Sequence, residues 1–349
     1  LGMPPFWTQA HEGEQVLVET VAGRVPWYEY TAYQAPSLAS EAWRRDQAEA
    51  LRELLRYCTS RPWASRLIGF WLTGEVTEEW FAWGSNDGQY ADYSGPTAGR
   101  FATWLADRGS PGADVSLPTP EQRDVKDRDL YPDTADGQRA AAYSRFYSEL
   151  TAETILHFAR VVKEETGGRS LVGAFYGYVI QLAGEPRQSS GGNMALRPLL
   201  ESEAVDFLGG IPLHDFRRLA GGYDPYISAT ESILAAGKLY CNENDLFSWL
   251  HPVIWYTEYD AGNPRAGAIA MHRRECANDA VVELDRPATC VGMKGDTSRD
   301  GIRQAKIVGC GHPIHQQTQL VAPRDGIDNR AIVGSAGTLG QTVDAGLVV

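Results

Sequence analysis

The sequence predicts an α/β fold in which helices alternate with short parallel strands. Two observations carry this prediction. Segments with helical periodicity separate four short apolar runs, and each of these runs ends in a polar segment. The runs are apolar throughout, as in parallel strands that are covered by other elements on both faces. Because each strand leads into a polar loop, we expect a (β/α)8 barrel whose carboxyl-end loops carry the chemistry.

The predicted helices are recognised by apolar residues three or four positions apart and by their end residues. Ser40 is a good N-cap for the first long helix, and Gly167 with Gly168 ends the second. The expected helices cover residues 40–58, 100–106, 137–165, 194–201, 229–236 and 266–283.

The predicted strands are the four apolar runs, at residues 67–72, 171–179, 205–209 and 238–242. The opening segment, residues 1–15, is expected to be the end of a further strand that runs into an aromatic loop. A doubly wound open sheet is the alternative to a barrel. No G-x-G-x-x-G motif follows any predicted strand and no G-x-x-x-x-G-K-S/T motif occurs, so nucleotide-binding versions of the open sheet lose support.

Composition limits the partners of this protein. The formal net charge of −13 over 349 residues disfavours nucleic acids and anionic membranes, since both need basic surfaces. No apolar run reaches the length of a membrane span. Five cysteines without regular spacing favour unpaired thiols, and with them a soluble cytoplasmic protein, over a disulfide framework. The 10 tryptophans and 16 tyrosines supply flat faces of the kind that bind sugar rings.

The last quarter of the chain differs from the rest. Tyr259 is the last aromatic residue, although about nine would be expected in the residues that follow it. Helical periodicity ends near Glu283. We therefore divide the chain into residues 1–284, which carry the barrel pattern, and a tail, residues 285–349, for which we predict little regular structure.

Two of the predicted strand ends are rich in carboxylates. Glu75, Glu78 and Glu79 follow the strand at 67–72, and Glu243 with Asp245 follows the strand at 238–242. Strand ends are generally polar, so each group alone is weak evidence of function. A retaining glycosidase, however, needs two carboxyl groups from different strands: one protonates the leaving group and the other attacks the anomeric carbon.

Several segments, in order along the chain, resemble the glycoside hydrolase family 42-like β-galactosidases. They include APSLASEAWRRD from Ala35, RLIGFWLTGEVTEEWFAWG from Arg66, LVGAFYGYVIQLAG from Leu171 and GKLYCNEND from Gly237. The resemblance implies a (β/α)8 barrel with the acid/base after the fourth strand, here Glu79, and the nucleophile at the end of the seventh, here Glu243. It also implies that the first strands and the last strand lie outside this chain, so that the barrel is incomplete.

The resemblance departs from the family at one position. Relatives usually have asparagine directly before the acid/base, where this chain has Glu78. This departure leaves the substrate open and makes Glu78 or Glu75 a competitor for the acid role. We expect substrate contacts from a set of residues near the two strand ends, namely Glu78, Trp80, Trp83, Tyr176, Tyr178 and Asp245. Core packing is the alternative for the aromatic residues, and capping of the next turn is the alternative for Asp245.

Three further features have weaker claims on function. Glu258 is a rival nucleophile, but it lies well past its strand end. His214 could reach the site from a loop, although a surface role is expected for it. The spacing of Cys310, His312 and His315 would suit zinc, but no fourth ligand is evident, and we predict no metal.

The sequence thus predicts a retaining, exo-acting glycosidase that needs no cofactor, with a β-galactosidase in first place. A glycosidase for another β-linked sugar, such as a mannoside or an arabinoside, is one alternative. A carbohydrate-binding relative without catalysis is the other. The expected partner is a carbohydrate, and the resemblance implies a homo-oligomer for the full-length protein.

Overall fold

The centre of the molecule is a five-stranded sheet in the order β3-β4-β5-β6-β7. The computed structural model describes residues 4–25, 35–75, 79–109, 114–125, 131–180, 188–210, 226–244 and 317–321. The strands of the sheet are β3 (Gly69–Leu72), β4 (Leu171–Phe175), β5 (Phe207–Gly210), β6 (Leu239–Asn244) and β7 (Gln317–Val321). The first four are parallel neighbours in chain order, which is the pattern that successive βα units produce. The four predicted strands are therefore confirmed.

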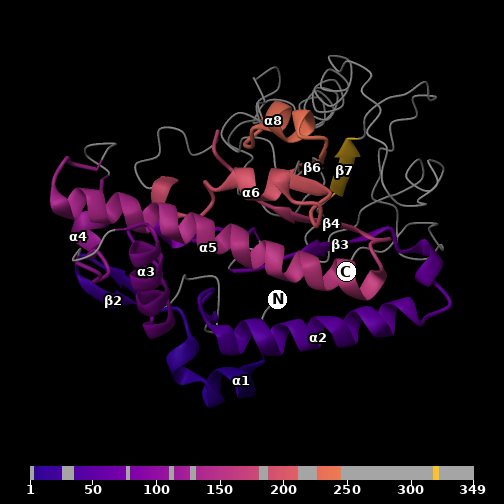
Figure 1. The fold of residues 1–349 in the computed structure, drawn as a ribbon, viewed down its shortest axis with the longest axis horizontal. Helices are drawn as coiled ribbons and strands as arrows, with labels where there is room; N and C mark the ends of the chain where they lie inside the picture. Colours follow the sequence, from indigo (N-terminus) through magenta and orange to yellow (C-terminus); the bar gives the residue numbers. More distant parts are fainter. Residues whose placement is uncertain are drawn as a thin grey trace, which may run out of the picture.

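Two long helices cover one face of this sheet. The first, α2 (Glu41–Thr59), begins after Ser40, whose side chain accepts a hydrogen bond from the Trp43 N–H. The second, α5 (Ala135–Thr166), ends at Gly167, which takes the left-handed conformation with φ 59°. Figure 1 shows α5 lying between α2 and the sheet. The shorter helices are α3 (Gly95–Asp107), α4 (Pro120–Arg123), α6 (Leu196–Glu201) and α8 (Thr230–Ala235).

Five of the six predicted helices correspond to α2, α3, α5, α6 and α8, with ends shifted by a few residues. The sixth, at 266–283, lies outside the described residues. Short 3-10 turns complete the described elements; they are η1 (Glu12–Glu14), η2 (Ala64–Arg66), η4 (Trp83–Asp87) and η5 (Gln188–Ser190). Within the part of the chain that the structure describes, no helix combines the length and the apolar character needed to cross a membrane.

The opening segment forms a helix, α1 (Pro5–Ala10), so the prediction of an aromatic loop there is wrong, while residues 1–3, where the predicted strand end would lie, are outside the described residues. Pro5 occupies the first turn, where its missing N–H would have had no helical partner. Trp7 is buried, and its indole N–H donates to the Asp46 carboxylate on α2 at 2.9 Å. A six-residue helix held by such a distant contact leaves too little periodicity to be recognised. A hairpin of β1 (Val18–Thr20) and β2 (Gly23–Val25) follows.

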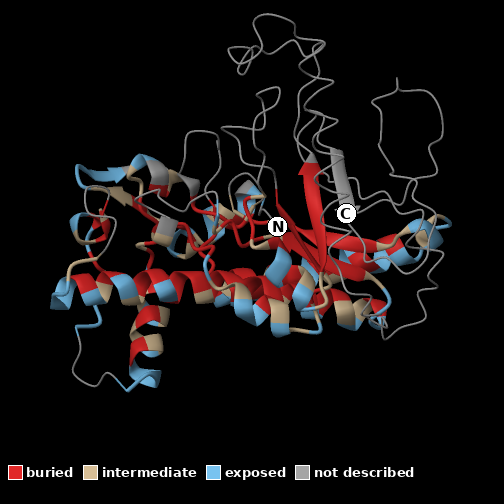
Figure 2. Ribbon diagram, turned by 90° about the horizontal axis from the view of Figure 1, so that it is seen from above, coloured by how far each residue is buried: buried red, intermediate tan, exposed pale blue. Residues whose placement is uncertain are grey.

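The strands place their side chains alternately on two faces of the sheet. One set packs with α2 and α5 in the main core, and it includes Phe70, Leu72, Val172, Ala174, Leu208 and Tyr240. The other set forms a separate apolar cluster of Trp71, Leu171, Phe207, Leu239 and Cys241. Figure 2 shows that buried residues run along both the strands and α5. In a barrel, the face that does not meet the helices is the interior.

The tail contributes one strand to the sheet. β7 pairs with β6 in antiparallel register, from Tyr240 opposite Val321 to Asn244 opposite Gln317. This strand is a regular element within the tail, but the rest of 285–349 lies outside the described residues, so the prediction of little regular structure there stays a prediction. The free edge of β6 offers unpaired backbone groups, which explains why an additional strand can pair there. Since β7 runs against its neighbour, it is not a further parallel unit of the barrel.

Candidate active site

Glu79 and Glu243 lie at the carboxyl-terminal edge of the same sheet. Glu243 is the penultimate residue of β6, and Glu79 stands in the turn that follows β3. Because β3, β4, β5 and β6 are all parallel, their carboxyl ends share one edge. This is the edge at which barrel enzymes carry their chemistry.

The turn that carries Glu79 is closed by contacts at its two ends. Glu79 forms a parallel bridge with Gly74, and the Trp80 N–H donates to the Gly74 carbonyl at 3.1 Å. The Trp80 indole N–H donates to the carbonyl of Leu72 at 2.8 Å. A side chain at Gly74 would collide with the indole, because a Cβ there would lie 2.6 Å from the Trp80 ring. These contacts hold Glu79 beside the end of β3.

Tyr178, just past β4, interacts with both glutamates. Its side chain is fully buried, and its hydroxyl donates to Glu79 Oε1 at 3.0 Å. Burial raises the pKa of Tyr178 well above its ordinary value, and the negative charges of Glu79 and Glu243 raise it further. The hydroxyl contacts Glu79 directly, and Glu243 acts on the same phenol through its charge.

Asn193 fixes the segment that carries Tyr178. Its Oδ1 accepts hydrogen bonds from the backbone N–H groups of Gly177 and Tyr178. Its Nδ2 donates to the carbonyl of Trp80 at 3.2 Å. One amide therefore joins the chain after β4 to the turn after β3. The sequence analysis missed Asn193, whose only local signal is the Gly-Gly-Asn turn sequence at 191–193.

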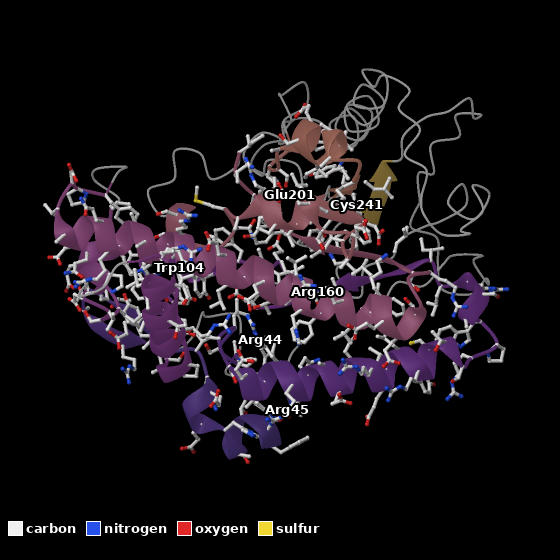
Figure 3. The ribbon with its side chains drawn as sticks, in the orientation of Figure 1. Arg44, Arg45, Trp104, Arg160, Glu201 and Cys241 are labelled. Atoms are coloured by element: carbon white, nitrogen blue, oxygen red, sulfur yellow. The ribbon has the colours of Figure 1, made fainter. Side chains whose placement is uncertain are left out.

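Glu243 belongs to the interior face of the sheet. Alternation along β6 places it on the same face as Leu239 and Cys241, which belong to the cluster around Trp71. Cys241 is labelled on β6 in Figure 3. The Trp71 ring contacts Phe175, with ring centroids 4.4 Å apart. Glu243 is 2% exposed and stands one interior layer above these apolar side chains.

A third carboxyl group, Glu75, lies in the same turn as Glu79. Burial raises the pKa of Glu75 to about 7, the charge of Asp92 adds to this rise, and a hydrogen bond from Tyr147 opposes it. The Tyr147 hydroxyl donates to Glu75 Oε1 at 2.8 Å. Glu75, the predicted competitor for the acid role, is therefore a buried carboxyl group that accepts a hydrogen bond from α5.

Three predicted substrate contacts, Trp80, Tyr176 and Tyr178, are 0% exposed in the structure, which favours the alternative of core packing for each of them. Trp80 is 0% exposed, because its indole packs on Gly74 and bonds to the strand end, so it is a core residue that offers no face to a sugar. Tyr176 is also fully buried, and its hydroxyl donates to the carbonyls of Ser148 and Gly192. Its role is packing against α5. Among the described side chains, Trp71 belongs to the cluster on the interior face of the sheet.

Other predicted residues cannot be placed. The side chain of Trp83, in η4, lies outside the described residues, as do Glu78, Asp245, His214, Glu258, Cys310, His312 and His315. Within the described ranges, no group of three histidine, cysteine, aspartate or glutamate side chains could hold a metal ion.

Comparison with known proteins identifies the fold. No protein-family model and no curated protein matches the chain. Among solved structures, the chain is similar to the catalytic domain of β-amylase from Paenibacillus polymyxa, with a TM-score of 0.50 and 13% sequence identity. The similarity covers 70% of this chain and 64% of that one. The four parallel strands, β3 to β6, form part of a (β/α)8 barrel. The predicted fold class is thereby confirmed.

A second solved structure is similar to a lesser degree. It is the β-galactosidase from the psychrophilic Marinomonas ef1, with a TM-score of 0.37 and 14% identity. The match covers 60% of this chain and 29% of that enzyme. At this level the similarity carries no argument about function.

Proposed function

We propose that this protein is a retaining glycoside hydrolase in which Glu79 is the acid/base and Glu243 is the nucleophile. One observation carries the proposal: Glu79 and Glu243 stand at the carboxyl-terminal edge of one sheet of parallel strands, where the buried Tyr178 hydroxyl donates to Glu79. Two carboxyl groups that approach from different strands of a barrel are the requirement of glycoside hydrolysis. The role of each glutamate comes from the sequence resemblance.

The proposed mechanism is a double displacement. Glu79 donates a proton to the glycosidic oxygen while the Glu243 carboxylate attacks the anomeric carbon, so the leaving group departs as an alcohol and a glycosyl-enzyme forms. Glu79, now ionised, takes a proton from water, and the resulting hydroxide attacks the anomeric carbon and releases Glu243. For this direct attack we expect the two carboxyl groups to lie about 5–5.5 Å apart, rather than the about 6.5–9.5 Å of an inverting pair.

A β-galactoside is the substrate we favour, and this preference rests on the sequence resemblance alone. The test is a panel of 4-nitrophenyl glycosides, including the β-galactoside, the β-mannoside and the α-arabinoside, assayed on the full chain. Proton NMR of the first product should show the anomer with retained configuration. Release of the inverted anomer would contradict the mechanism. If galactosides bind without turnover, and bind equally well to Glu243→Gln, the protein is a carbohydrate-binding protein and not an enzyme.

A further inference from the structure

The turn between Gly74 and Trp80 contains two residues in an unfavourable backbone conformation. Glu75 has φ 59° and Trp80 has φ 54°, although neither is glycine. The left-handed region is unfavourable for a residue with a Cβ, so it persists only where surrounding contacts enforce it. Trp80 has such contacts in its buried indole and in its bond to Leu72. Glu75 must be held by something else.

The contact that holds Glu75 comes from α5. The Tyr147 hydroxyl donates to Glu75 Oε1 at 2.8 Å, and the Tyr147 side chain is only 1% exposed. Its ring stacks on Tyr143, with centroids 6.1 Å apart and planes inclined by 14°. The Tyr143 hydroxyl in turn donates to the carbonyl of Asp92 at 2.8 Å. Packing thus fixes the position of the hydroxyl that holds Glu75.

We propose that the bond between Tyr147 and Glu75 is a tether that positions Glu79 for proton transfer. The inference rests on the proposed function. Glu79 lies beyond the last residue of β3, so its place depends on the turn, and the turn is attached to the helix layer at Glu75. Glu75 is then a positioning residue: it acts on Glu79 through its neighbour Gly74, which bridges to Glu79 and accepts from the Trp80 N–H, and it does not touch the reacting atoms.

The choice of leaving group distinguishes a displaced general acid from a general loss of activity. An alkoxide or a phenolate needs the proton of the acid as it departs, whereas dinitrophenolate is stable enough to leave without it. A displacement of the acid by about 1 Å can cost about 10²-fold in rate. A released tether should therefore slow the phenyl glycoside and spare the dinitrophenyl glycoside of the same sugar.

The experiment compares three variants of the full chain. In Tyr147→Phe we expect kcat/KM for the phenyl glycoside to fall about 10- to 100-fold, with the 2,4-dinitrophenyl glycoside changed less than about twofold. Glu75→Gln keeps an oxygen that can accept from Tyr147, so its loss on the phenyl glycoside should be smaller than that of Tyr147→Phe. Tyr143→Phe is the matched control, because it loses a buried hydroxyl on the same helix but leaves the tether intact. An equal loss on both substrates in Tyr147→Phe, or no loss, would overturn the proposal.

A second measurement tests the tether without any turnover. The Trp80 amide closes the turn on Gly74, so hydrogen–deuterium exchange of peptides that contain it reports whether the turn opens. Exchange should rise in Tyr147→Phe and stay at the wild-type level in Tyr143→Phe. Unchanged exchange in Tyr147→Phe refutes the tether even if the protein is a glycosidase. Faster exchange in a protein that hydrolyses no glycoside supports the structural tether, but refutes its role in proton transfer together with the proposed function.

Discussion

The two strand ends that carry Glu243 and Glu79 hold their carboxylates by different means. Glu243 lies within β6, whose backbone pairs with β5 on one side and β7 on the other. Glu79 lies in a turn that is closed by single hydrogen bonds. Their donors are the Trp80 indole, Tyr178 just past β4, and Tyr147 on α5. A ladder of backbone bonds does not depend on any one side chain. Substitutions around Glu79 should therefore disturb the site more readily than substitutions around Glu243.

The largest expected effect separates the two carboxylates themselves. Glu79→Gln should lower kcat/KM for a phenyl glycoside by about 10²–10⁴-fold, the usual contribution of a general acid, and affect a dinitrophenyl glycoside far less. Glu243→Gln should lose more than this on both substrates, because no glycosyl-enzyme can form. Steady-state kinetics with the two leaving groups makes the measurement. Similar losses on both substrates in both variants would erase the proposed division of roles.

The next effect concerns the proton on Glu75. It is measured as a pH-dependent change in the free energy of unfolding. Its folded pKa of about 7 exceeds the ordinary glutamate value of 4.5, so its contribution to stability is complete below pH 4.5 and is lost as pH rises to about 7. The loss amounts to at most about 3 kcal/mol. Glu75→Gln cannot ionise and should avoid it, so the variant should be close to wild type at pH 4 and more stable at pH 8. Urea unfolding at both pH values measures this, and equal stability at pH 8 would show that Glu75 is not buried as described.

A smaller effect tests how tightly the turn is packed. Gly74→Ala places a methyl group against the Trp80 ring and should lower the free energy of unfolding by about 1–3 kcal/mol. Gly99→Ala on α3 is the matched control, because nothing lies within 4 Å of a Cβ there. That change should stabilise the protein by up to about 1 kcal/mol. Thermal unfolding of both variants gives the comparison, and a neutral Gly74→Ala would mean that the indole does not cover this glycine.

The smallest effect is expected at Tyr178. Tyr178→Phe removes a hydrogen bond that favours the ionised form of Glu79. The limb of the kcat/KM profile that reports the acid should move to higher pH, with activity at the optimum largely kept. A pH profile measured with the phenyl glycoside detects the shift. A shift to lower pH would mean that the phenol does not donate to this carboxylate.

Local patterns were enough to predict the parts of the fold that repeat. The apolar runs around Trp71, Val172, Leu208 and Tyr240 mark the four parallel strands because each is buried on both faces. The same patterns placed Glu79 and Glu243 at one edge, since parallel strands end together. The regular alternation of helices and strands thus predicts both the sheet and the position of its acidic strand ends.

Contacts between distant segments could not be predicted in this way. Trp80 was expected to face substrate. It lies in a turn and not in a strand, so the alternation of side chains along a strand could not predict where its ring points. Tyr147 lies 72 residues from Glu75, and no periodicity links the two positions. Asn193 acts through backbone groups of Gly177 and Tyr178, which leave no pattern in the sequence. β7 depends on the free edge of β6 and not on a strand signal of its own.

The buried carboxyl group of Glu75 also couples folding to the uptake of a proton. At pH 6 the unfolded chain has released this proton, while the folded chain retains it, so folding takes up close to one hydrogen ion at this residue. The buffer must supply that ion, and its own ionisation enthalpy enters the measured heat. Calorimetric unfolding enthalpies at pH 6 should therefore differ between phosphate and imidazole buffers, and the part of that difference due to this residue should be absent in Glu75→Gln.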